Sequence, residues 1–119
     1  MKIKTSELIG PALDWAVSKC EGVNEEAFRL YYEPTEPADY DSNGYPEFHY
    51  STVWAQGGPI IEREMLNLSP TSTDIWNCWP NFRMSDELWQ RGPTPLVAAM
   101  RCFVASKLGD KVDVPEELV

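Results

Sequence analysis

Apolar residues near the N-terminus of the chain recur with the spacing of an α-helix. They are Leu8, Ala12, Leu13, Ala16, Val17 and Cys20. The pattern predicts a helix over about residues 6–21. Thr5 or Ser6 can cap its start, and Gly22 marks its end.

The same spacing recurs near the C-terminus, at Leu96, Val97, Ala99, Met100, Phe103, Val104 and Leu108. It predicts a second helix. Thr94 is its expected N-cap, Pro95 its first residue and Gly109 its end, because proline suits the first helical position and glycine the last turn.

Alternation between apolar and polar residues predicts strands elsewhere. Residues 2–5 form an expected edge strand. Residues 59–66 and 73–79 are expected to pair as a hairpin through a loop at 67–72. Residues 24–32 favour a strand over a helical turn. Short turns are expected at 85–89 and 114–118.

These elements predict an α+β fold, in which a small antiparallel sheet packs with an N-terminal and a C-terminal helix. The length of 119 residues predicts a single domain over residues 1–119. Residues 33–47 contain prolines, acids and Asn43-Gly44 but no Lys or Arg, so they predict an acidic, proline-rich loop.

Charge narrows the range of partners. The chain has 19 acidic and 10 basic residues, a net charge of -9. Such a surface repels a phosphate backbone, so we expect no general nucleic-acid binding, although a local basic pocket can hold a small anion. No apolar run is long enough to span a bilayer, so we expect no membrane association. A homo-oligomer is compatible with the sequence.

Cysteine usage and the start of the chain indicate the compartment. Cys20, Cys78 and Cys102 are odd in number and far apart, which favours free thiols in a reducing environment. The first residues lack the apolar core of a signal peptide. The sequence therefore predicts a cytosolic protein.

No catalytic or metal signature is present. The three cysteines and His49, the single histidine, are scattered, with no pair at the spacing of metal ligands. No motif places a nucleophile beside His49. Glu62 and Glu64 fit solvent-facing strand charges better than a catalytic pair. We expect no catalytic residues, no metal and no cofactor.

The segment Val53–Glu64 is the strongest candidate for a binding loop. It places Trp54 and Gln56 before Gly57 and Gly58, which permit a positive φ or close approach by another group, and before the rigid Pro59. A tight turn explains the glycines equally well.

Four of the five tryptophans can be divided by their context in the sequence. Trp15 and Trp76 fit a core position, whereas Trp54 and Trp79 lie beside turns, where an indole can stack on a planar ring.

Arginine suits phosphate because its planar fork donates two hydrogen bonds. Arg63, Arg83, Arg91 and Arg101 are the candidate anion ligands, and surface ion pairs are the alternative for each. We expect Trp54 and Gln56 to line a pocket with Arg63 or Arg101. The full set of expected ligand-binding residues is Trp54, Gln56, Gly57, Gly58, Arg63, Trp79, Thr94 and Arg101.

Three blocks resemble a known family: Lys4-Thr5-Ser6-Glu7-Leu8 with Ala12-Leu13-Asp14-Trp15-Ala16-Val17; Trp54-Ala55-Gln56-Gly57-Gly58-Pro59-Ile60-Ile61; and residues 92–101 with Ala105-Ser106-Lys107-Leu108-Gly109. The chain is similar to the NinX-like family of small tailed-phage and prophage proteins. The resemblance implies a phage accessory protein of the bacterial cytoplasm. It brings no assigned activity and no catalytic residues.

Two functional hypotheses follow. The first is a non-catalytic protein that binds a small nucleotide-derived molecule and sequesters a host defence signal. The alternative is an acidic inhibitor that docks on a host protein, in the manner of a nucleic-acid mimic; the acidic residues 33–47 favour this one. A third hypothesis, ranked below these two, is an enzyme that acts on nucleotides.

Overall fold

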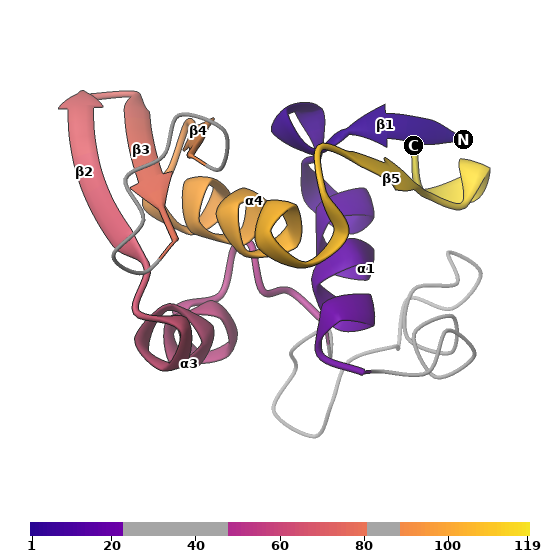
Figure 1. Cartoon of the computed structure of the whole chain (residues 1–119), viewed down its shortest axis with the longest axis horizontal. Coiled ribbons are helices and arrows are strands. Elements are labelled where there is room, and N and C mark those ends of the chain that lie inside the picture. Colours follow the sequence, from indigo (N-terminus) through magenta and orange to yellow (C-terminus); the bar gives the residue numbers. More distant parts are fainter. Residues whose placement is uncertain (23–47, 81–88) are drawn as a thin grey trace.

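A computed structural model describes residues 1–22, 48–80 and 89–119 of the chain. Helix α4 (Pro95–Leu108) lies at the centre of this part of the molecule, between a three-stranded sheet and helix α1, with helix α3 alongside (Figure 1). Most residues from Leu96 to Ala105 are buried, on every side of the helix. An α-helix that is apolar all round is expected at such a central position. The predicted C-terminal helix is confirmed, with Thr94 as its N-cap.

Helix α1 spans Gly10–Cys20, so the predicted helix over 6–21 begins too early. Residues Thr5–Glu7 form a separate short 3₁₀ helix, η1, and Ile9 is extended. Pro11 explains the break, because it disfavours helical backbone in the residue before it and supplies no N–H for a helical hydrogen bond. Gly22, with φ of 82°, ends the helix as predicted.

The predicted strand over 59–66 is wrong. Residues Trp54–Glu64 form helix α3, and Pro59 lies inside it. Its inner face is made by Gly57, Ile60 and Ile61, at the i, i+3, i+4 spacing of a helix. The short apolar pattern after Pro59 is compatible with the two-residue period of a strand and with the 3.6-residue period of a helix. Gly57, Gly58 and Pro59 favoured a loop over a helix.

The hairpin exists but is displaced along the chain. Strand β2 (Asn67–Ser72) occupies the predicted loop, and it pairs antiparallel with β3 (Ile75–Trp79). Strand β4 (Gln90–Gly92) adds to the other side of β3, so the order is β2-β3-β4. Because β2 is an edge strand, it accommodates Pro70 and exposed polar residues that a central strand would not.

A second, two-stranded sheet joins the ends of the described chain. Strand β1 (Lys2–Lys4) confirms the expected edge strand over residues 2–5. It pairs antiparallel with β5 (Lys111–Asp113), a strand that the sequence did not predict. Thr5 reinforces this junction, because its hydroxyl donates to the Gly109 carbonyl at 2.6 Å. The predicted C-terminal turn is the 3₁₀ helix η2 (Glu116–Leu118).

The α+β fold class is confirmed, with two small antiparallel sheets instead of one. Trp15 is buried in the core as predicted, whereas Trp76 packs against the core from a partly buried position. The expected strand over 24–32, the acidic loop at 33–47 and most of the expected turn at 85–89 lie outside the described residues. None of the helices in the described segments has the length and apolar character that crossing a bilayer requires.

Candidate ligand-binding clefts

One cavity lies where η1, the β2–β3 turn, β4 and α4 meet. Its volume is about 660 Å³. We call it the Arg101 cleft. Its polar lining residues are Ser6, Asp74, Gln90, Arg91 and Arg101, with Trp89 as the aromatic one.

Arg101 is held firmly in the wall of this cleft. Its Nε donates to the Leu8 carbonyl and its Nη1 to the Arg91 carbonyl, each at 2.7 Å. Burial lowers the pKa of the guanidinium, and the charge of Glu7 opposes that shift. Arg101 forms no ion pair with a carboxylate of the described residues. Its charge is therefore fixed in place by two main-chain carbonyls, and the charge of Glu7 acts on it from beyond ion-pair distance.

Trp89 and Arg91 add an aromatic surface and a second cation to this cleft. The Arg91 guanidinium lies over the Trp89 ring, 5.3 Å from its centroid, which holds both side chains together at the cleft. The Gln90 side-chain oxygen is buried and has no hydrogen-bond partner among the described residues.

A second cavity of about 410 Å³ contains Trp54, and we call it the Trp54 cleft. Ile9, Gly10, Ser51 and Thr94 also line it. Pro93 lines both cavities, so the two clefts are neighbours. We expected Trp54 and Arg101 to line the same pocket. They line two adjacent clefts instead.

Gln56, Gly57 and Gly58 contribute to the packing and hydrogen bonding of α3. The Gln56 side-chain oxygen accepts a hydrogen bond from the His49 main-chain N–H at 2.6 Å, and Gln56 lines neither cleft. Gly57 and Gly58 are helical, so neither adopts the positive φ that glycine permits. Close approach is confirmed at Gly57 alone, where an added Cβ would collide with the Tyr50 carbonyl oxygen.

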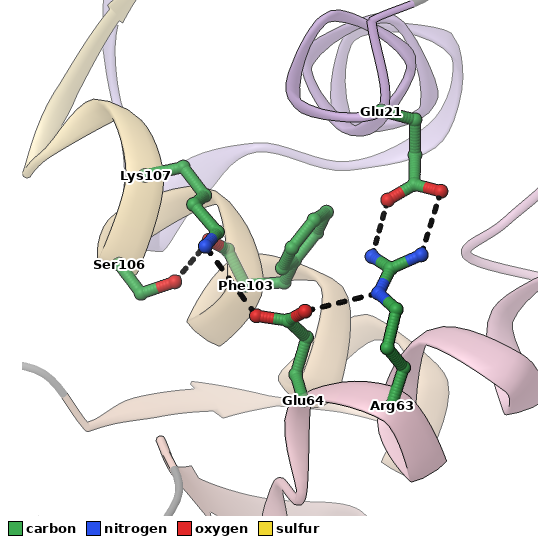
Figure 2. Close-up of polar contacts among 6 residues, drawn as sticks. All are labelled: Glu21, Arg63, Glu64, Phe103, Ser106 and Lys107. Carbon is green, nitrogen blue, oxygen red and sulfur yellow. Dashed lines mark hydrogen bonds and ion pairs between the residues drawn. The ribbon is translucent and has the colours of Figure 1, made fainter.

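Arg63 belongs to an ion-pair network on another part of the surface (Figure 2). Its guanidinium binds both carboxylate oxygens of Glu21, and its Nε donates to Glu64 at 3.0 Å. Lys107 pairs with the other oxygen of Glu64 at 3.5 Å. The network joins the ends of α1, α3 and α4, as the ion-pair alternative predicted, and Arg63 lines neither cleft.

Of the other expected ligand-binding residues, Thr94 lines a cleft and Trp79 does not. The Thr94 hydroxyl accepts from the Val97 N–H at 3.1 Å, so it caps α4 while lining the Trp54 cleft. Trp79 is partly buried in β3 and lines neither cleft. Arg83 lies outside the described residues.

Trp89 and Gln90 line the Arg101 cleft but were not among the site residues expected from the sequence. A signal was present, because the run Trp89-Gln90-Arg91-Gly92-Pro93 combines an indole, an amide and a cation before a Gly-Pro turn. Gly92 is needed at this turn, since an added Cβ would lie 2.5 Å from the Ala98 nitrogen of α4. Close packing of β4 on the first turn of α4 thus sets the position of the whole run.

No group of three or more His, Cys, Asp or Glu side chains in residues 1–22, 48–80 and 89–119 is placed to hold a metal ion. None of the three cysteines forms a disulfide; Cys78 and Cys102 are buried, and Cys20 is partly exposed. Burial lowers the pKa of His49.

Comparison with known proteins identifies the family. The family model described as Bacteriophage P22, NinX matches residues 4–107, which is most of the chain. The chain therefore belongs to this family, as its three sequence blocks predicted, and it is a phage protein. A search of curated proteins found no match.

Proposed function

We propose that this member of the NinX family binds a small anionic molecule with a planar ring in the Arg101 cleft. A nucleotide derivative is the ligand class that combines these features. The protein acts without catalysis, as a phage accessory protein in the cytoplasm of the bacterial host. There it sequesters a host defence signal.

The observation that carries the proposal is the state of Arg101. Its guanidinium is half-buried and fixed by two main-chain carbonyls, and it forms no close ion pair with a described carboxylate, although the charge of Glu7 acts on it from a greater distance. Three of its five N–H donors remain outside those two hydrogen bonds. A phosphate is a suitable acceptor for such a preorganised cation.

The other lining groups suit the rest of a nucleotide. The Trp89–Arg91 pair offers flat surfaces on which a base can stack. Asp74 at the cleft can accept a hydrogen bond from a sugar hydroxyl. The volume of about 660 Å³ lies within the range of small-molecule sites.

Calorimetric titration with cyclic dinucleotides, ADP-ribose derivatives and nucleoside monophosphates tests the proposal. We expect one or more of them to bind. Trp89→Ala should then weaken binding about tenfold or more, because stacking contributes roughly 1–3 kcal/mol per base. Arg91→Gln should also weaken it.

Arg63→Gln is the matched control, because it also removes one guanidinium, but from outside the cleft. It should leave the affinity unchanged. If no member of the panel binds, or if Arg63→Gln and Arg91→Gln weaken binding equally, the ligand proposal fails. The acidic protein-interaction hypothesis would then take its place.

A further inference from the structure

Two buried thiols meet where β3 packs on α4. Cys78 of β3 and Cys102 of α4 belong to the same hydrophobic core, and both are 0% exposed. The Cys78 thiol donates a hydrogen bond to the Cys102 sulfur, and this contact, together with burial, raises the pKa of Cys78. The Trp79 carbonyl oxygen, 3.9 Å from the Cys78 sulfur, is a second acceptor. The two sulfur atoms are therefore neighbours in the folded protein.

The close packing of α4 on the sheet explains why these cysteines meet. At Gly92 of β4, an added Cβ would lie only 2.9 Å from the Ala98 Cα of α4. Cys102 follows Ala98 by four residues, so it lies one turn further along the same face of the helix. Gln90 lies two residues before Gly92 and pairs with Cys78 of β3. Residues two apart in a strand, and residues paired across strands, share a face of the sheet, so Cys78 points toward α4.

From this contact and this packing we infer that Cys78 and Cys102 are an oxidisable pair that forms a disulfide within the folded protein. A disulfide requires Cα atoms roughly 4.4–6.8 Å apart, and the small residues Gly92 and Ala98 let the helix and the sheet approach this closely. The bond would join the middle strand of the sheet to the central helix. The inference is independent of ligand binding in the Arg101 cleft, because it rests on the core and not on that cavity.

The reaction needs a two-electron oxidant, and hydrogen peroxide is the one that we propose. Peroxide oxidises one thiol to a sulfenic acid and releases water. The second thiol then attacks the sulfenic sulfur. The S–S bond forms, the S–O bond breaks, and the hydroxyl leaves with the proton of the attacking thiol as a second water molecule. A small dithiol reverses the bond by thiol–disulfide exchange.

Cys20 is the internal comparison, because it is the one cysteine that is partly exposed. If exposure decided the outcome, peroxide would drive Cys20 into disulfides between two molecules. If the position of the sulfur atoms decides it, the disulfide joins Cys78 to Cys102 within one molecule.

The test treats the folded full chain with hydrogen peroxide near neutral pH, blocks the remaining thiols in denaturant and maps disulfides by peptide mass spectrometry. We expect the main disulfide to join Cys78 and Cys102. The oxidised protein should melt at least about 5 °C higher before reduction with dithiothreitol than after it, because the bond constrains the unfolded chain. Dithiothreitol does not reverse methionine oxidation, so this difference isolates the disulfide.

Cys20→Ala is the matched control, and it should keep both the disulfide and the difference in melting temperature. Cys102→Ala should lose both, and Cys78→Ala serves the same purpose if the first variant does not fold. Three outcomes would overturn the inference: both thiols remain unpaired after prolonged treatment, the main disulfide contains Cys20, or the oxidised protein melts below the reduced one. Nucleotide binding is measured on the reduced protein, so either proposal can fail alone.

Discussion

Gly57 lies where α3 passes closest to the Tyr50 main chain, and this contact leaves no room for a side chain. Its neighbour Gly58 faces a wider space, with Trp54 the nearest group to an added Cβ, at 4.0 Å. Gly58 precedes Pro59, and helical backbone before a proline is disfavoured for residues with a Cβ. The two adjacent glycines therefore have different physical causes.

This difference gives a prediction at the residue scale. Gly57→Ala should lower the free energy of unfolding by about 1–3 kcal/mol, since the Tyr50 carbonyl must move. Gly58→Ala should change it by less than about 1 kcal/mol, because the gain in helix propensity opposes the pre-proline clash. Urea unfolding of both variants measures the two values. Equal losses would contradict the packing described for α3.

Cys20 gives a second prediction at this scale. Burial and the charge of Glu21 raise the pKa of its thiol to about 11, and only the thiolate is alkylated. The rate of alkylation by iodoacetamide should therefore rise about tenfold per pH unit from pH 8 to pH 10. Peptide mass spectrometry measures this rate at Cys20 itself.

Buried Cys78 and Cys102 should stay unlabelled over the same range, which confirms that the protein remains folded. A rate at Cys20 that levels off near pH 9 would contradict the environment described here, because an ordinary exposed thiol ionises there.

Helix α4 and helix α3 show what sequence patterns can predict at the scale of one element. At the start of α4 every local signal predicts a helix. Thr94 is a capping residue, Pro95 suits the first helical position, and apolar residues follow at helical spacing. In α3, local signals oppose tertiary packing. Gly57, Gly58 and Pro59 each disfavour a helix, and the contact that requires Gly57 comes from a residue seven positions earlier.

The cap of α4 can be tested directly. Thr94→Ala removes the hydroxyl that accepts from Val97, so it should destabilise the protein by about 0.5–2 kcal/mol. Thr94→Ser keeps the acceptor and should lose much less. Thermal unfolding at a fixed pH compares the two. A Thr94→Ser loss as large as that of Thr94→Ala would mean that the methyl group, and not the cap, matters.

The ion pairs between helices should contribute little to stability. Arg63 is half exposed, and exposed pairs typically contribute about 0–1 kcal/mol. Arg63→Gln should therefore lower the free energy of unfolding by less than about 1 kcal/mol, and 0.5 M NaCl should shrink the difference because salt screens the pair. Denaturant unfolding at low and high salt measures both. A loss above 2 kcal/mol would show a structural role that rules out Arg63→Gln as a binding control.

At the scale of the whole molecule, the sequence predicted the fold class and the α-helices at both ends, because their apolar periods are long. It did not predict how strands and helices meet. Whether Trp54 and Arg101 share one cavity depends on the turn at Pro93, which separates the two clefts. Trp89 was not among the site residues expected from the sequence, because its position at the Arg101 cleft depends on how β4 packs on α4.

The central claim is that the Arg101 cleft holds a small anionic molecule. The most direct measurement is mass spectrometry of the small molecules released from protein made in bacteria with active defence signalling. The wild-type protein and a Trp89→Ala, Arg91→Gln double variant are purified in parallel. We predict a phosphate-bearing molecule with a purine or pyrimidine ring that accompanies the wild-type protein and is lost from the variant. No such molecule, or equal amounts from both proteins, would contradict the claim.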